Sequence, residues 1–167
     1  GGVVYKDMPV STEQIIHPAA YFLTRDNPTK IAFGTLSNAT DVYENDLGEF
    51  ETRLFLFQHL DDQNDAIRGA SGWDGDRYAV VNTPQGPGIV WLTVWDSPVE
   101  AGEFYDIAGR AIEKRFSTKA ATGGTSQAKK YSASGRALQL STVEIGGRPV
   151  VIYEDLPAGA NLAPGQR

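Results

Sequence analysis

The chain has 167 residues, of which 41% are hydrophobic and 22% charged, and its formal net charge at pH 7 is −6. This is the composition of an ordinary globular protein, so a disordered chain is excluded. The acidic balance argues against nucleic acid as a partner, because a phosphate backbone demands a Lys/Arg surface. No apolar run approaches the roughly 20 residues of a membrane-spanning helix, so no transmembrane segment is expected.

The sequence contains no cysteine, which excludes disulfides, thiolate nucleophiles and cysteine-based metal sites. It begins at Gly1 rather than at an initiator Met. We therefore expect that a signal peptide, a longer N-terminal region or a tag was removed. The length predicts one domain, expected over residues 1–156, and residues 157–167 are expected to form an extended, loosely attached tail.

The first half of the chain is expected to be mainly helical. Ser11 begins a short helix, and residues 30–36 follow as a weak strand. Hydrophobic residues at helical spacing predict a longer helix over residues 44–60. A second short helix is expected over residues 65–71, with Gly72 just after its end.

All three tryptophans lie in residues 72–97, the most apolar part of the chain. A glycine turn is followed by a predicted strand over residues 77–83, a Pro/Gly loop and a second strand over residues 89–95. The second strand carries apolar residues on both faces. We therefore place it at the centre of a sheet, covered by helices or by a helix and a partner surface.

The strongest local pattern follows the second strand. Ser97 can cap a helix, Pro98 suits the first helical position, and Glu100 completes a capping box. The hydrophobic spacing predicts that this helix extends to about Phe116. Residues 117–134 are rich in Ser, Thr, Gly and Lys, so we expect a long, exposed and mobile connection there.

Two strands, over residues 136–145 and 148–154, are predicted to close the domain. Gly146 and Gly147 join them as a two-residue hairpin turn in which both residues take positive φ. The complete pattern predicts an α+β fold. Its sheet should be mostly antiparallel, formed by a β-hairpin, a helix and a second β-hairpin, and covered by helices from the N-terminal half.

No combination of residues predicts catalysis or a cofactor. His17 and His59 are far apart in the sequence and lack the His-Glu-x-x-His spacing that would place two imidazoles on one helical face. Neither a serine-nucleophile elbow nor a phosphate-binding loop is present. We therefore expect no catalytic, cofactor-binding or metal-binding residues and no enzymatic activity. A pair of carboxylates distant in sequence, as in glycosidases, stays open.

Two charged groupings are candidate binding sites. Asp74 and Asp76 resemble the first ligands of a calcium loop, but the later ligands are missing. The alternative is that Asp74 and Gly75 form a turn and that Asp76 pairs locally, with Arg77 or with a backbone N–H. The second grouping is a small basic cluster, which we interpret as a solvated surface in preference to an anion or headgroup contact. Its members are Lys114, Arg115, Lys119, Lys129 and Lys130.

Three segments of the chain together resemble segments of a known protein family. Ser-Thr-Glu-Gln-Ile-Ile-His-Pro over residues 11–18, Leu-Gly-Glu-Phe over residues 47–50 and Gly-Trp-Asp-Gly-Asp-Arg-Tyr over residues 72–78 are similar to the C-terminal portion of exported bacterial and archaeal zincin-like metallopeptidases. Asp74 replaces the glycine usual in that family. The resemblance implies an exported protein, and the metal-binding helix of such proteins would lie upstream of Gly1.

Two interpretations follow. The chain is expected to be a non-catalytic extracytoplasmic structural or interaction domain, periplasmic or secreted. It would act as an accessory subunit that stabilises a larger assembly, with membrane protein complexes among its candidate partners. Alternatively, it is the C-terminal domain of a zinc-metallopeptidase-like protein whose catalytic part is absent from this chain.

Overall fold

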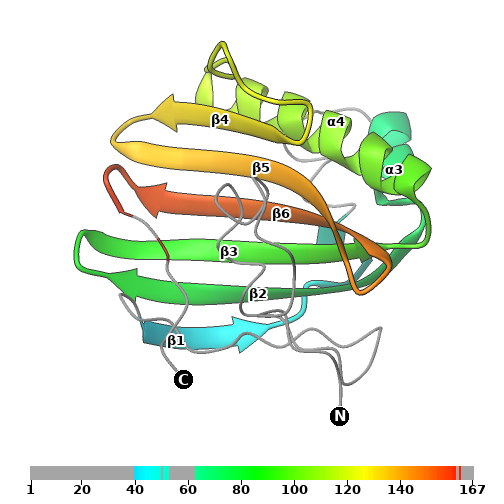
Figure 1. Cartoon of the computed structure of the whole chain (residues 1–167), viewed down its shortest axis with the longest axis horizontal. Helices are drawn as coiled ribbons and strands as arrows, with labels where there is room; N and C mark the ends of the chain where they lie inside the picture. Colours follow the sequence, from blue (N-terminus) through cyan, green and yellow to red (C-terminus); the bar gives the residue numbers. More distant parts are fainter. Residues whose placement is uncertain (1–39, 50, 53–62, 161, 163–167) are drawn as a thin grey trace.

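The computed structural model describes residues 40–49, 51–52, 63–160 and 162. They form a six-stranded sheet in the order β1-β2-β3-β6-β5-β4 (Figure 1). Every neighbouring pair of strands is antiparallel. The strands are β1 (Thr40–Asn45), β2 (Trp73–Thr83), β3 (Gly86–Trp95), β4 (Ala128–Ala133), β5 (Arg136–Ile145) and β6 (Arg148–Pro157), and the helices are α3 (Gln63–Ala70) and α4 (Pro98–Phe116).

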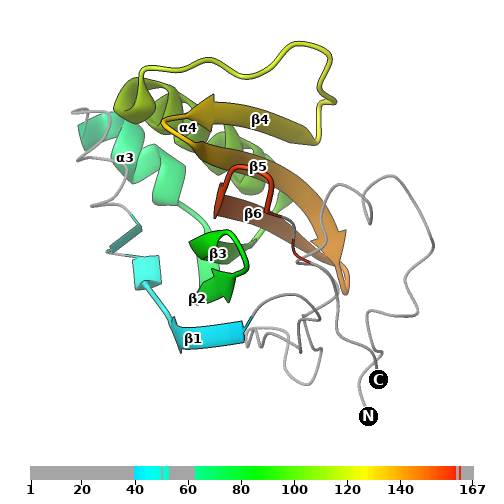
Figure 2. The same ribbon diagram turned by 90° about the vertical axis from the view of Figure 1, so that its left-hand side faces the viewer.

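Helix α4 covers one face of the sheet (Figure 2) and packs against β3, β5 and β6. Its start confirms the predicted cap, because Ser97 is extended (φ −149°, ψ 160°) and its hydroxyl accepts a hydrogen bond from the Glu100 backbone N–H at 3.3 Å. The same hydroxyl donates to Glu100 Oε2 at 3.2 Å. The first contact satisfies a helix-end donor that would otherwise lack a partner, and the second orients the Ser97 hydroxyl.

Strand periodicity assigns the core side chains to two faces, since alternate residues point in opposite directions. On the α4 face, Trp95 stacks on Phe104 with ring centroids 4.6 Å apart. The core of this face includes Trp91, Trp95, Phe104, Ile107, Ala111, Ile112, Leu138, Leu140 and Val151. The core of the opposite face includes Ala79, Val81, Val90, Leu92, Val94, Ile145, Val150, Ile152 and Leu156.

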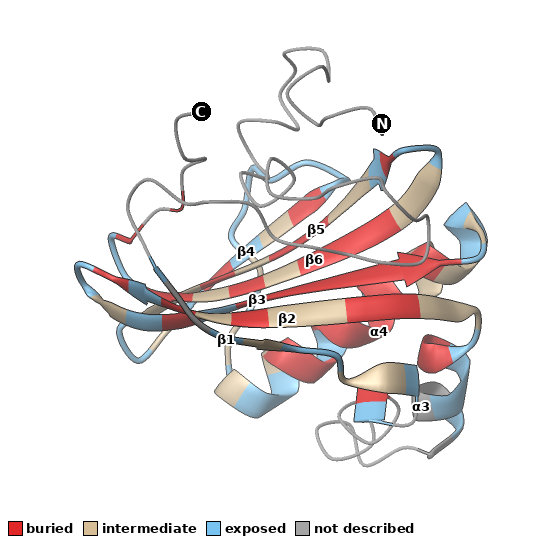
Figure 3. Cartoon of the chain, turned by 90° about the horizontal axis from the view of Figure 1, so that it is seen from below, coloured by how far each residue is buried: buried red, intermediate tan, exposed pale blue. Residues whose placement is uncertain are grey.

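Strand β3 lies third in the sheet and is buried from residue 90 to residue 95 (Figure 3). This confirms the prediction that the Trp-containing strand occupies the centre of the sheet. The second hairpin is confirmed too, because Gly146 (φ 61°) and Gly147 (φ 78°) both have positive φ in the β5–β6 turn. Glycine adopts this conformation without the steric penalty of a Cβ atom.

The predicted α+β class is wrong. Strands make up 48% of the described residues and helices 26%, so the protein is mainly one open antiparallel sheet. The covering helix, α4, comes from the second half of the chain, whereas α3 packs against α4. The prediction relied on covering helices from the first half of the chain, above all the one expected over residues 44–60. Most of that segment lies outside the described residues.

Two strands were missed at the edges of the sheet. Residues 40–45 form β1, and helical structure begins at residue 48, so the helix predicted over residues 44–60 begins too early. Residues 128–133 form β4 inside the expected mobile connection. Both strands are short and polar, as edge strands commonly are, so neither has an apolar period. The elements predicted before residue 40, and residues 53–60, lie outside the described residues.

The chain beyond β6 starts inside the fold. Ala160 and Leu162 are 7% and 4% exposed and belong to the core of the face opposite α4. The Ala158 N–H donates to the Gly135 carbonyl at 2.9 Å, which ties this segment to the β4–β5 turn. Within the described part of the chain, no helix is long and apolar enough to cross a membrane.

Candidate functional site

Among the described residues, two carboxyl groups are buried in the sheet, and Asp76 is the one whose two oxygens both accept hydrogen bonds. Its Oδ2 accepts hydrogen bonds from the Leu47 N–H at 2.8 Å and the Trp91 indole N–H at 2.9 Å, and its Oδ1 accepts one from the Gly48 N–H at 2.7 Å. Residue 48 begins the helical stretch after β1. Asp76 therefore joins β2, β3 and a helix start, where a negative charge is favourable.

The calcium alternative receives no support from this geometry. Asp74 forms an ion pair with Arg148, and it lies at an irregularity in β2 where the register shifts between Trp73 and Gly75. Asp76 pairs with backbone N–H groups, but these are distant in the sequence and not local as predicted, and the predicted turn at Asp74 and Gly75 is wrong because both lie in β2. In the described ranges, no group of three or more His, Cys, Asp or Glu side chains could hold a metal ion.

Glu154 is the second buried carboxyl, 6% exposed, on the face opposite α4. Among the described residues its Oε1 has no hydrogen-bond partner, and neither does the Oγ of Ser141, which is 1% exposed. Burial raises the pKa of Glu154 to about 7, and the nearby ammonium of Lys130 opposes this shift. A carboxyl in such surroundings favours its neutral form near neutrality.

Sequence analysis missed Glu154, although a signal was present. Residues Val150, Ile152, Glu154 and Leu156 alternate along β6 and share one face. A glutamate in an otherwise apolar alternation is a buried charge candidate. The prediction ended the strand at residue 154, so the continuation of the alternation to Leu156 was not recognised.

The basic cluster is dispersed by the fold. Lys129 pairs with Asp106 at 3.6 Å and lies over the Tyr105 ring, with its Nζ 4.3 Å from the centroid. Arg115 lies over the Phe116 ring, with its guanidinium carbon 5.4 Å from the centroid. Lys130 points to the other face of the sheet because it alternates with Lys129. The cluster therefore makes no single anion site.

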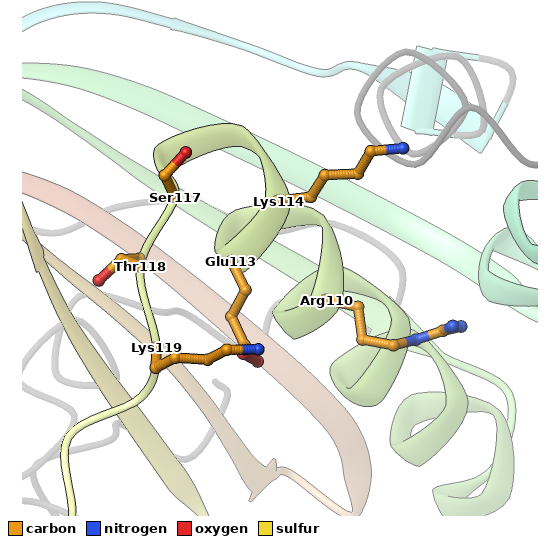
Figure 4. Close-up of a pocket in the computed structure, with 6 residues that line it drawn as sticks. All are labelled: Arg110, Glu113, Lys114, Ser117, Thr118 and Lys119. Carbon is orange, nitrogen blue, oxygen red and sulfur yellow. The ribbon is translucent and has the colours of Figure 1, made fainter.

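A shallow hollow of about 600 Å³ lies at the C-terminal end of α4 (Figure 4). Its lining residues are Arg110, Glu113, Lys114, Ser117, Thr118 and Lys119. Glu113 and Lys119 converge as an ion pair at 3.3 Å, and the Thr118 hydroxyl donates to the Ser132 carbonyl at 3.1 Å. These contacts brace the start of the α4–β4 connection.

An exposed apolar surface lies on the α4 face of the sheet and includes part of the edge strand β1. Tyr43 pairs with Val80, and Val80 pairs with Ile89, so the three side chains form one row across β1, β2 and β3. Tyr43 is 51% exposed and Ile89 40% exposed. We call Tyr43, Val80 and Ile89 the exposed row. Sequence analysis did not identify it, because Tyr43 fell next to the start of a predicted helix.

Comparison with known proteins identifies a family but not a function. No curated protein matches the chain. Residues 35–163 match the sequence profile of a family described as a domain of unknown function, DUF8575. The match does not bear on the resemblance to zincin-like metallopeptidases, which stays a prediction. Because the matched residues span most of the chain, this protein belongs to the DUF8575 family.

Proposed function

We propose that the chain is a non-catalytic, extracytoplasmic interaction domain that docks on a partner protein through the exposed row. In this role it would act as an accessory subunit of a larger assembly. The observation that supports the proposal most is the placement of Tyr43, Val80 and Ile89 side by side on a rigid sheet. The extracytoplasmic location rests on the sequence resemblance.

The exposed row has the composition and support of a contact surface. Tyrosine offers a large apolar area with a polar tip, which is why it is enriched in protein interfaces. The hydroxyl of Tyr43 accepts a hydrogen bond from Asn45 Nδ2 at 2.8 Å, and its ring lies 6.0 Å from that of Tyr78. These contacts orient the Tyr43 ring before a partner arrives and so lower the entropic cost of binding.

Helix α4 leaves this part of the sheet uncovered. It packs against β3, β5 and β6, whereas β1 is an edge strand, separated from β3 by β2, and lies away from the helix (Figure 2). The α4 face is therefore buried beneath the helix and exposed at Tyr43 and Ile89. An exposed apolar group on a fixed strand is a reasonable docking surface for a partner.

The test is a pull-down from gently extracted source cells, analysed by mass spectrometry, with the tagged chain as bait. A charge placed in an apolar contact must be desolvated, so Ile89→Glu should reduce partner recovery at least tenfold. Val99→Glu is the matched control, because Val99 is exposed (71%) but lies at the start of α4. This variant should recover the partner normally.

Two results would contradict the proposal. One is a chain that recovers no specific partner and stays monomeric in the extract. The other is an Ile89→Glu variant that folds normally, as judged by its thermal melt, and recovers the same partner as the unmodified chain. Equal losses in Ile89→Glu and Val99→Glu would place the contact elsewhere.

A further inference from the structure

On the face opposite α4, one row of paired residues crosses the whole sheet. It consists of Glu44, Ala79, Val90, Glu154, Gln139 and Lys130. Glu154 thus lies between Val90 of β3 and Gln139 of β5 in the interior of the sheet. The row ends at Lys130 on the edge strand β4, so a cation at the edge and a buried carboxyl share one line.

The immediate surroundings of Glu154 do not favour its charged form. Ile152 and Leu156 flank it along β6, and both belong to the apolar core of this face. In the part of the chain that the structure describes, Glu154 Oε1 and Ser141 Oγ have no hydrogen-bond partners. An ionised carboxylate with an unpaired oxygen in an apolar core is costly, so the neutral form of the group is favoured.

Two charged residues of the described structure lie in the same row. Lys130 is two strands away, about 10 Å at the spacing of neighbouring strands, and its side chain is exposed. Glu44 is three strands away on the other side and forms an ion pair with Arg77 at 3.0 Å. Lys130 is therefore the cation positioned to respond to Glu154, and its flexible four-carbon stem can reorient toward the carboxylate.

We infer that Glu154 is a proton-operated switch in the sheet and that Lys130 is the counter-ion of its ionised form. With the proton bound, the neutral carboxyl belongs to the apolar face and Lys130 extends into solvent. When the proton leaves, the carboxylate attracts Lys130 across Gln139 toward the core. The edge strand β4 is then pulled against β5, its neighbour in the sheet, so its position depends on pH.

This inference is independent of the exposed row, which lies on the other face of the sheet. Its consequence concerns β4 and the connection that precedes it. The Ala121 N–H donates to the Lys130 carbonyl at 2.8 Å, so movement of Lys130 is transmitted to residues 117–127. The pH of the surroundings would thereby alter this edge of the molecule.

The test is an NMR titration of the carboxyl carbons of the intact chain between pH 4 and pH 9, with Glu154→Gln used to assign the Glu154 signal. We expect the Glu154 carboxyl to titrate near pH 7, well above the ordinary value of 4.5. Lys130→Gln removes the opposing cation and should shift the midpoint upward. The backbone amides of residues 121 and 130 should shift with the same midpoint in the unmodified chain only.

The inference is overturned if Glu154 titrates below pH 5.5, or if Lys130→Gln leaves the midpoint unchanged. It is also overturned if the amides of residues 121 and 130 keep their pH-dependent shift in both variants. Lys130 is exposed, so its variant should fold even if Glu154→Gln does not. In that case the Glu154 signal can be assigned from the backbone of the unmodified chain.

Discussion

Asp76 and Glu154 are two carboxyl groups buried to the same extent, each 6% exposed, on opposite faces of one sheet. Asp76 accepts three hydrogen bonds from β3 and from the start of a helix. Glu154 has an oxygen with no partner among the described residues. The difference shows that burial alone does not decide the role of an acidic group. The role depends on whether neighbouring groups donate hydrogen bonds to its oxygens.

The two groups consequently have different effects on the fold. Asp76 holds elements that are distant in sequence, because residues 47 and 48 meet β2 and β3 at its carboxylate. Glu154 has no comparable structural task, and its position costs stability whenever it is ionised. We interpret Asp76 as a structural residue and Glu154 as a responsive one.

The largest expected effect is that of Asp76→Ala. This change leaves the Leu47 and Gly48 N–H groups and the Trp91 indole N–H without their acceptor, and each buried donor left unpaired costs about 1–3 kcal/mol. We expect the free energy of unfolding to fall by roughly 3–5 kcal/mol in urea denaturation. Asp76→Asn keeps one acceptor oxygen and should lose less.

An Asp76→Ala chain that unfolds at the same urea concentration as the unmodified chain would show that the three hydrogen bonds are not important for stability. A loss in Asp76→Asn as large as that in Asp76→Ala would instead indicate that the negative charge dominates.

The second effect is the pH dependence caused by Glu154. Its pKa is raised in the folded state, from 4.5 to about 7. Between these values the folded chain keeps a proton that the unfolded chain releases. The contribution of Glu154 to stability should therefore be greatest below pH 4.5, decline as the pH rises to 7 and then level off. The shift corresponds to a decline of about 3 kcal/mol.

Urea denaturation at several pH values should show that Glu154→Gln removes most of this decline. Glu144→Gln, at an exposed position of β5, is the control for the loss of one negative charge and should retain the decline. Identical pH profiles for Glu154→Gln and the unmodified chain would assign the pH dependence to other groups.

The smallest effect is expected from Ser141→Ala. The Ser141 hydroxyl is buried without a hydrogen-bond partner among the described residues, so its removal relieves an unsatisfied group and creates little cavity. The free energy of unfolding should stay within about 1 kcal/mol of its original value or increase. Differential scanning calorimetry would measure this. A loss above 2 kcal/mol would mean that the hydroxyl has a partner, such as an ordered water.

The sequence predicted the centre of the fold well. Ser97, Pro98 and Glu100 identified the start of α4, and Gly146 and Gly147 identified a hairpin turn, because each pattern has one dominant local solution. The double-sided apolar run of β3 likewise predicted a central strand. These features depend on neighbouring residues, so they can be derived without tertiary information.

The edges and the candidate sites could not be predicted in the same way. β1 and β4 are polar, and they are strands because β2 and β5 offer them hydrogen bonds, not because of their own propensity. The row of Tyr43, Val80 and Ile89 arises from pairing between distant strands. Asp76 was expected to pair locally, with Arg77 or a backbone N–H, whereas its backbone partners lie 28 and 29 residues away.

The most direct test of the proposed interaction is site-specific photo-cross-linking in the source cells. A photoreactive residue replaces Ile89 in one version of the chain and Val99 in another, since both positions are exposed but only Ile89 belongs to the exposed row. We predict a discrete cross-linked protein from position 89 and none from position 99. Cross-links from position 99 alone, or none from either position, would contradict a docking surface on this part of the sheet.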